Sequence, residues 1–244
     1  MSKTYKNPPV IEVLCEFQFV PDQQWDITIP ELMYERIKDE FSEKQQFNRY
    51  QIGMDIRLNQ VGEEIAQPIS RMQFLKKDKS ALIQLDPDVL IVNHLKPYPA
   101  WHQFQPLILK NLQAYKDISH PKGFKHIGLR YINAIEIPKS AMIEEYFNLC
   151  PSLPKDLSNK CRDFFLKVDI PYEEGQDSLT IILARDMSKE SLGLILDLNY
   201  AMIAPEKVSL DAIEEWLKIA HGRIEESFEG CITDKCRMLF EGGE

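Results

Sequence analysis

The chain has 244 residues, of which 44% are hydrophobic and 27% are charged, a balance typical of a soluble globular protein with a sizeable core. Its net charge of −9 disfavours a nucleic-acid partner, because phosphate backbones are bound by a surplus of Lys and Arg. The excess of acidic over basic residues is larger in residues 121–244 than in residues 1–120.

The lack of a recognisable targeting signal and the cysteine usage together predict a cytoplasmic protein. The opening segment Met1–Pro9 lacks the apolar stretch of a signal peptide. No apolar run approaches the ~20 residues that a membrane helix needs, so we expect no membrane association. The cysteine count is odd and contains no CxxC pair, which favours reduced thiols. The five cysteines are Cys15, Cys150, Cys161, Cys231 and Cys236.

The first half of the chain predicts the element order β-α-β-β-β-β-α. Alternation of apolar and polar residues over Val10–Phe19 predicts a strand with Ile11, Val13 and Cys15 facing the core. The elements that follow are a helix over Pro30–Ser42, strands over Tyr50–Gln60, Arg71–Lys76, Ser80–Leu85 and Val89–Leu95, and a helix over Ala100–Lys116. Pro106 lies inside the last helix and lacks an amide hydrogen, so we expect a kink or a delayed start there.

The second half predicts the order β-α-β-β-β-α. Its first strand, His126–Pro138, alternates over its whole length and places Ile127, Leu129, Tyr131, Ile135 and Ile137 on one face. The elements that follow are a short helix over Ala141–Leu149, strands over Asp163–Pro171, Leu179–Arg185 and Leu192–Ile203, and a long helix. Ser209 is the expected N-cap of that helix. Its expected buried stripe is Leu210, Ile213, Leu217, Ala220, Ile224 and Phe228.

This order of elements predicts an α+β fold with a curved antiparallel sheet and long helices. The recurrence of the pattern predicts two tandem halves, β-α-β(4)-α over residues 8–120 and β-α-β(3)-α over residues 121–244, packed as one compact unit. The layout is similar to the helix-grip and TATA-binding-protein-like folds, in which a curved sheet packs against a long C-terminal helix.

Common catalytic signatures are missing from the sequence. It contains no HExxH, GxGxxG, GxxxxGK[ST] or GxSxG motif, so metalloprotease, dinucleotide, P-loop and hydrolase-elbow chemistry have no support. None of the histidines has a metal-ligand spacing to Cys or Glu. They are His94, His102, His120, His126 and His221. We predict no metal, no cofactor and no catalytic residue.

The polar side of the predicted sheet is the candidate binding surface. Its residues are Glu12, Glu16, Arg130, Glu136, Lys167, Asp169, Asp197 and Asn199, and Asn133 is added as a candidate binding residue. One interpretation is a solvated sheet face. The other is a cleft in which Arg130 binds an anionic ligand or pairs with Glu12 or Glu16, because a guanidinium fits a carboxylate through two hydrogen bonds.

Two segments together resemble a sporadically distributed, uncharacterised prokaryotic protein family of about this length. They are the opening Asn7–Phe19, NPPVIEVLCEFQF, and the central Gly128–Asn133, GLRYIN, with support from His221, Phe228 and Ile232–Thr233. The resemblance covers nearly the whole chain and brings no known activity or site residues. A sporadic distribution implies an accessory gene, of the kind found in defence or toxin-neutralising loci.

Three functional hypotheses follow. The preferred one is a non-enzymatic interaction protein that binds a basic protein partner through its acidic second half, including the final helix. A second copy of the chain is the alternative partner. The second hypothesis is a small-ligand binder with a cavity between the sheet and the C-terminal helix. The third is an enzyme that uses sheet carboxylates with Arg130.

Overall fold

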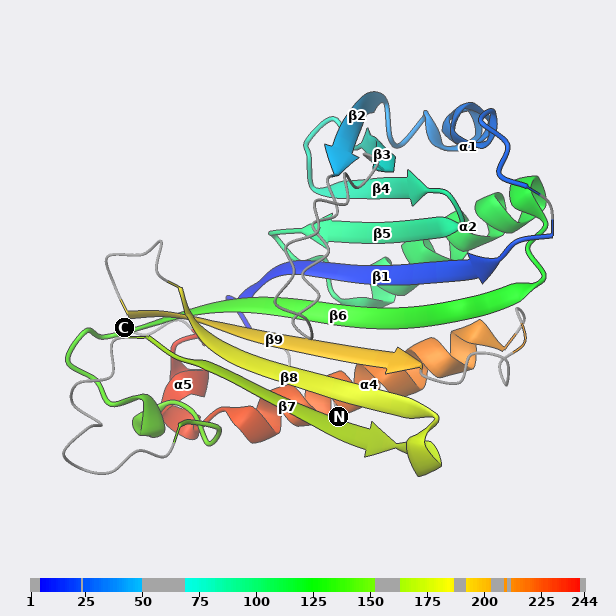
Figure 1. Ribbon diagram of the computed structural model, residues 1–244. Coiled ribbons are helices and arrows are strands. Elements are labelled where there is room, and N and C mark those ends of the chain that lie inside the picture. The colour runs from blue at the N-terminus through cyan, green and yellow to red at the C-terminus, as the bar shows by residue number, and fades with distance from the viewer. Residues whose placement is uncertain are drawn as a thin grey trace, which may run out of the picture.

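A single antiparallel sheet organises the computed structural model, which describes residues 5–22, 24–49, 69–151, 163–186, 192–202, 209 and 212–241. The strand order is β2-β3-β4-β5-β1-β6-β9-β8-β7 (Figure 1). The strands are β1 Val10–Val20, β2 Glu43–Arg49, β3 Ile69–Leu75, β4 Ala81–Asp86, β5 Val89–Leu95, β6 Gly123–Ile137, β7 Phe165–Tyr172, β8 Asp177–Asp186 and β9 Leu192–Met202. The predicted α+β class with an antiparallel sheet is confirmed.

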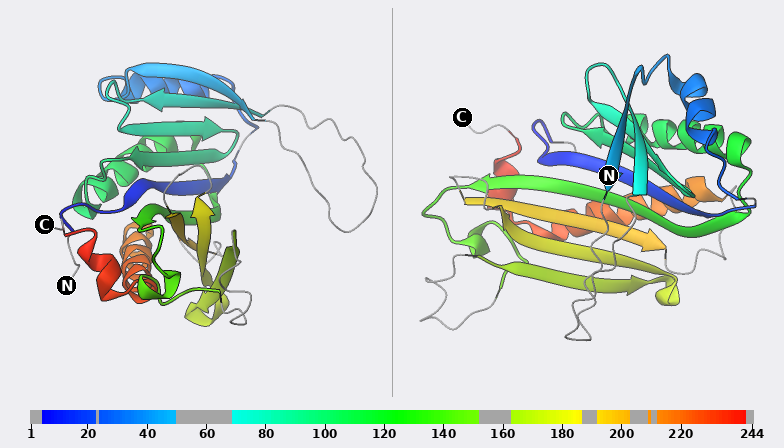
Figure 2. Two further views of the ribbon diagram at one scale, coloured as in Figure 1. Left: turned by 90° about the vertical axis from the view of Figure 1, so that its left-hand side faces the viewer. Right: turned by 45° about the horizontal axis from the view of Figure 1, so that its top comes forward.

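The helices cover one face of this sheet. They are α1 Ile29–Ile37, α2 Trp101–Ser119, α4 Ile213–Cys231 and α5 Asp234–Met238, with single 3-10 turns η1 Ile143–Glu145 and η2 Glu173–Gly175. Seen along the sheet, α2 and α4 lie on the same side (Figure 2). The opposite face carries none of the helices that the structure describes, and we call it the open face.

The hydrophobic core lies between the helices and the sheet. Strand β6 contributes Ile127, Leu129, Tyr131, Ile135 and Ile137, all buried as the alternation predicted. Helix α2 contributes Phe104, Ile108, Leu112 and Tyr115, also buried. Burying each large apolar side chain contributes about 1.5–3 kcal/mol, so the helix-covered face supplies most of the stabilisation.

At the start of strand β1, the buried residue differs from the predicted one. Ile11 was expected in the core, but it is half-buried and Val10 is buried instead. The register with β6 shifts between Val10 and Glu12, and such a bulge rotates the side chains on one side of it. Beyond the bulge the predicted alternation holds, with Val13 and Cys15 fully buried.

Helix boundaries differ from the predictions because tertiary contacts override local signals. Helix α2 begins at Trp101 with Pro106 inside it, so the proline does not delay its start. Helix α4 begins at Ile213 with Ala212 as its N-cap, not Ser209. The predicted helix over Ala141–Leu149 is reduced to η1, because Phe147 forms a β-bridge with Ile232.

Strand β2 was not predicted, since Glu43–Arg49 is too polar to show apolar alternation. The strand expected at Tyr50–Gln60 lies outside the described residues, and so does Leu210. The four cysteines that the structure describes are unpaired thiols. None of the described helices has the length and apolar character needed to span a membrane.

Candidate functional site

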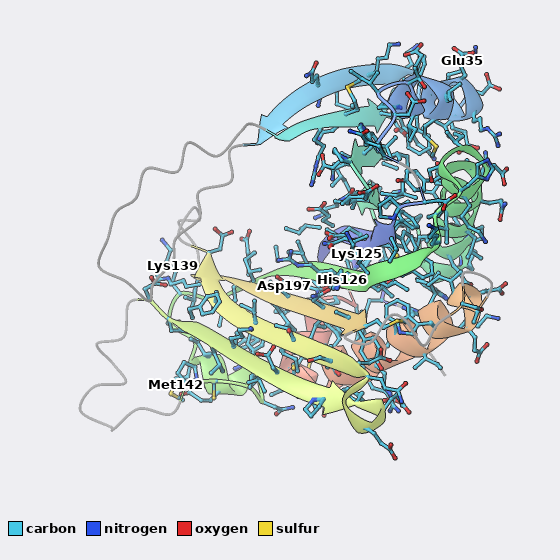
Figure 3. All side chains as sticks on the ribbon, turned by 45° about the vertical axis from the view of Figure 1, so that its right-hand side comes forward. Glu35, Lys125, His126, Lys139, Met142 and Asp197 are labelled. Carbon is cyan, nitrogen blue, oxygen red and sulfur yellow. The ribbon has the colours of Figure 1, made fainter. Side chains whose placement is uncertain are left out.

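The open face is built from alternate residues of the nine strands. Both ends of the sheet bend towards this face, so it lies on the inner side of the curve (Figure 3). Across its middle, the strand register aligns Asn93 of β5, Leu14 of β1, Arg130 of β6 and Asn199 of β9 in one row. Glu12, Ile132 and Asp197 form the next row. Of the predicted candidates, Glu12, Glu16, Asp197 and Asn199 therefore lie around Arg130.

Arg130 is bound to Asp197 through two hydrogen bonds. Its Nε donates to Oδ1 of Asp197 at 2.8 Å and its Nη2 donates to Oδ2 at 2.5 Å. The Asp197 side chain is only 8% exposed, whereas that of Arg130 is 41% exposed. These hydrogen bonds, together with the nearby charges of Glu12 and Glu16, raise the pKa of Arg130 further above its ordinary value. The guanidinium is thus neutralised by Asp197, which leaves little of it to bind an anionic ligand.

Glu12 and Glu16 flank Leu14 on β1, on either side of Arg130. Neither carboxylate has an ion-pair partner among the described residues, and each accepts a hydrogen bond from a neutral amide. Nδ2 of Asn93 donates to Glu12 at 2.6 Å, and Nε2 of Gln18 donates to Glu16 at 2.7 Å. The charges of both carboxylates act on Arg130, but Asp197 is already paired with it, so Arg130, Asp197, Glu12 and Glu16 together carry three negative charges against one positive charge.

A ladder of side-chain amides holds Glu12 in place. Gln45 of β2 donates to Gln73 of β3 at 2.8 Å, and Gln73 donates to Gln84 of β4 at 2.9 Å. Gln84 donates to Asn93 of β5 at 2.9 Å, and Asn93 donates to Glu12. All four amides point the same way, so each bond polarises the next towards the carboxylate. The ladder crosses five strands and fixes a negative charge at its end.

A second ion pair adjoins the ladder. Nε of Arg71 donates to Oδ2 of Asp86 at 2.8 Å, Nη2 contacts the same oxygen, and Nη1 donates to Gln84 at 3.3 Å. Asp86 is buried, and its Oδ1 has no hydrogen-bond partner among the residues that the structure describes. Arg71 therefore links a buried carboxylate to the amide ladder.

Aliphatic side chains alternate with these polar groups. Leu14, Ile132, Ile182 and Ile195 lie on the open face and are half-buried, while Ile91 is 5% exposed. A solvated sheet face would carry mainly polar residues. This mixture of half-buried aliphatics, fixed amides and carboxylates is instead typical of the protein surfaces that bind other proteins.

Gly128 permits a close approach on the same face. A Cβ atom at this position would lie 3.2 Å from Nε2 of His126 and 3.4 Å from Oδ1 of Asn199. Both side chains therefore lean over β6 at Gly128. Asn199, a predicted candidate residue, is half-buried directly opposite Arg130.

Four predicted candidates lie away from Arg130: Lys167 and Asp169, which are exposed on the edge strand β7, and Asn133 and Glu136 of β6. Asn133 is on the helix-covered face, where it is 2% exposed and its Nδ2 donates to the carbonyl oxygen of Leu196 at 3.0 Å. Glu136 is exposed and six residues further along β6, about 20 Å from Arg130 at a strand rise of about 3.3 Å per residue. The strand period explains why Asn133 is buried on the helix-covered face, because odd-numbered residues of this part of β6 face the helices.

The acidic helix α4 is largely paired with its own neighbours. Glu214 lies 3.0 Å from Lys218, and Glu226 lies 3.5 Å from Arg223. Glu229 accepts from Arg237 of α5 at 2.7 Å. These ion pairs are exposed or half-exposed and reduce the field that the helix presents.

The space between the sheet and α4 is filled by packed side chains. Leu198 and Tyr200 of β9 and Leu217 and Ala220 of α4 are fully buried. The cavities described lie elsewhere: one of about 120 Å³ lies at the C-terminal end of α2, and one of about 290 Å³ lies beside its first turns. The described residues contain no cluster of three or more His, Cys, Asp or Glu side chains that could hold a metal ion.

The sequence placed Arg130, Glu12, Glu16, Asp197 and Asn199 on one sheet face, where the structure has them, but it did not predict the ladder. Gln73 and Gln84 stand between apolar residues at the strand period, which was the available signal. Their partners depend on the pairing of four strands, which one sequence does not specify. A scan of protein-family models finds no match to this chain, and a search of curated proteins finds none either.

Proposed function

We propose that the protein is a non-enzymatic binding protein that takes a basic polypeptide partner on the open face of its sheet. The observation that carries the proposal is the pair of carboxylates, Glu12 and Glu16, held by neutral amides and lacking a described counter-ion. Two fixed negative charges on half-buried side chains favour a ligand that brings cations. The resemblance noted for the sequence is compatible with an accessory or toxin-neutralising role for such a partner.

The spacing of these residues suggests the form of the partner. Glu12 and Glu16 are four residues apart on β1, or about 13 Å at a strand rise of about 3.3 Å per residue. An extended segment with two Lys or Arg residues four positions apart matches that distance. Aliphatic residues between them would lie over Leu14 and Ile132.

The other predicted functions receive less support from the geometry. Asp197 occupies two donors of Arg130, which disfavours both an anionic ligand and a catalytic role for that guanidinium. The packed interface between α4 and the sheet disfavours a ligand cavity there. A second copy bound through the same surface would bring like charges together, which favours a basic partner over a homodimer.

We also infer that the chain arose from two tandem halves with the layout of a TATA-binding-protein-like fold. The strand order supports this inference. In residues 8–120 the meander returns β5 to the side of β1, and in residues 121–244 it returns β9 to the side of β6. Each meander is followed by a 19-residue helix, and β1 and β6 meet at the centre of the sheet.

A peptide-binding measurement tests the proposed function. The probe is a labelled nine-residue peptide with two Lys four positions apart and Val or Thr elsewhere. The double variant Glu12→Gln/Glu16→Gln keeps the amide hydrogen bonds and removes both charges. Its Kd, measured by fluorescence anisotropy at low salt, should rise about tenfold, because each charge pair contributes up to about 1 kcal/mol.

The matched control is Glu214→Gln/Glu215→Gln on α4. It also removes two negative charges, but from the helix-covered side of the molecule. Its Kd should equal that of the unmodified protein. Equal weakening by the two double variants would mean that net charge alone attracts the peptide, and the open face would lose its assigned role.

A further inference from the structure

A second candidate site lies at one end of the sheet, away from the open face. The cavity of about 120 Å³ at the C-terminal end of α2 is lined by Phe19, Trp25, Tyr115 and three aspartates, Asp22, Asp26 and Asp88. An engineered cavity of about 150 Å³ binds benzene, so this volume suits a ligand of about six heavy atoms.

The charges around the cavity favour a cation. Asp22 is paired with Lys122 at 2.7 Å, but the other two aspartates have no described cationic partner. Asp26 accepts hydrogen bonds from the backbone nitrogen and the hydroxyl of Thr28, and these bonds lower its pKa below the ordinary value. The basic group among the lining residues is His120.

The C-terminal end of helix α2 adds to the negative electrostatic potential in the cavity. Ile118 and Ser119 line the cavity, and the last turn of the 19-residue helix carries the negative end of its dipole. Burial, with a contribution from the charge of Asp88, raises the pKa of Tyr115 to about 12. Asp88 is therefore close enough to act on the Tyr115 hydroxyl.

Three aromatic rings form part of the wall, alongside aliphatic side chains such as Ile29 and Leu32. Phe19 and Tyr115 stack with their centroids 4.6 Å apart. Trp25 is half-buried, and its ring makes no aromatic contact or hydrogen bond with the other described residues, unlike Trp101 and Trp216. Trp25 and the carboxylates line the same cavity, and a cation over an indole face is a contact that binds organic ammonium groups.

We propose that this cavity binds a small organic ammonium group, held by the Trp25 ring and the Asp88 and Asp26 carboxylates. The group can belong to a free alkylammonium or to the side chain of a methylated lysine. Both present a cation with apolar carbon around it, which suits an aromatic wall better than a hydrated metal ion does.

Calorimetric titration with choline tests the proposal on the full chain. Choline should bind, and 3,3-dimethylbutanol, its uncharged analogue, should bind at least fivefold more weakly. Trp25→Leu and Asp88→Asn should each weaken choline binding by about fivefold or more. Asp169→Asn, which removes an exposed carboxylate from β7, is the matched control and should leave the affinity unchanged.

A second titration, with an acetylated trimethyllysine amide, distinguishes the two sources. Tighter binding of this compound than of choline would assign the site to a protein side chain, and the reverse would assign it to a free amine. Equal affinity for choline and its uncharged analogue would overturn the proposal, as would equal effects of Asp88→Asn and Asp169→Asn. Because Trp25 and Asp88 lie outside the open face, this result is independent of the peptide experiment.

Discussion

At the scale of single residues, Asp177 is a carboxylate buried without a cation among the described residues. It is 5% exposed and accepts hydrogen bonds from the hydroxyl of Tyr200 at 3.0 Å and from Nε1 of Trp216 at 3.3 Å. Burial raises its pKa above the ordinary value of 3.8, although both hydrogen bonds oppose that rise. The folded protein therefore holds this proton to a higher pH than the unfolded chain does.

The sign of the effect on stability follows from this difference. Between pH 3.8 and the raised pKa, the folded state binds more protons than the unfolded state, so Asp177 lowers the free energy of unfolding as pH rises. The variant Asp177→Asn removes that titration, and its amide can still accept from Trp216 and donate to Tyr200. Its free energy of unfolding should decline less from pH 4 to pH 7 than that of the unmodified protein.

Urea denaturation at several pH values measures how the free energy of unfolding changes with pH. Asp169→Asn is the control, because Asp169 is exposed and its hydrogen bonds lower its pKa, which gives the opposite dependence. If Asp177→Asn retained the full decline, the burial of this carboxylate would not be its cause.

Prediction at this scale succeeded where the apolar pattern decides the outcome. Cys15 was expected to face the core and is fully buried. Asp177 was left out of the predicted strand, which began at Leu179, because Asp disfavours strands. Its hydrogen bonds to Tyr200 and Trp216 come from β9 and α4, and local sequence carries no sign of them.

At the scale of elements, the amide ladder ties four neighbouring strands to β1. Its links differ in burial, since Asn93 is 1% exposed and Gln45 is fully on the surface. Asn93→Ala should lower the free energy of unfolding by about 1–3 kcal/mol, because it leaves the Gln84 amide and one Glu12 oxygen without their partners. Gln45→Ala should change it by less than about 0.5 kcal/mol, because water replaces the lost bond.

Urea denaturation monitored by circular dichroism measures both values. A cost for Gln45→Ala equal to that for Asn93→Ala would mean that the ladder acts as one cooperative unit along its whole length. A negligible cost for both would mean that it does not stabilise the sheet.

Strands with strong alternation, such as β1 and β6, were predicted to within a few residues. Strand β2 was not, because its polar sequence becomes a strand only by pairing with β3. The helix expected at Ala141–Leu149 failed for a similar reason, since the bridge between Phe147 and Ile232 competes with it. Pairing between distant segments is the information that a single sequence lacks.

At the scale of the whole molecule, the two predicted halves meet on the helix-covered face. The hydroxyl groups of Tyr98 and Tyr131 lie 2.8 Å apart, and that of Tyr131 lies 3.2 Å from Nδ1 of His221. The His221 ring stacks on Trp101 with centroids 4.2 Å apart, and its Nε2 lies 3.3 Å from Glu225. Tyr98 and Trp101 come from residues 8–120, and the others come from residues 121–244.

The order of elements predicted the α+β class with an antiparallel sheet, but not these contacts. Alternation placed Tyr131 on the apolar face of its strand. That pattern does not indicate that the rings of Trp101 and His221 stack, because the stacking requires the relative positions of α2 and α4. The amphipathic patterns specify which face of each element is buried, and the sheet order then decides which buried residues meet.

A double-mutant cycle measures how strongly this cluster couples the halves. Tyr131→Phe leaves the hydroxyl of the half-buried Tyr98 without its partner and should lower the free energy of unfolding by about 1 kcal/mol. The double variant Tyr98→Phe/Tyr131→Phe should lose about 1 kcal/mol less than the sum of the losses in the two single variants. The second substitution removes the hydroxyl that the first one leaves unpaired. Tyr98→Phe with Tyr172→Phe is the control cycle and should be additive, since the rings of Tyr172 and Tyr98 make no described contact. Additivity in the Tyr98–Tyr131 cycle would mean that the halves are held by the β1–β6 pairing and the core alone, with no contribution from this hydroxyl pair.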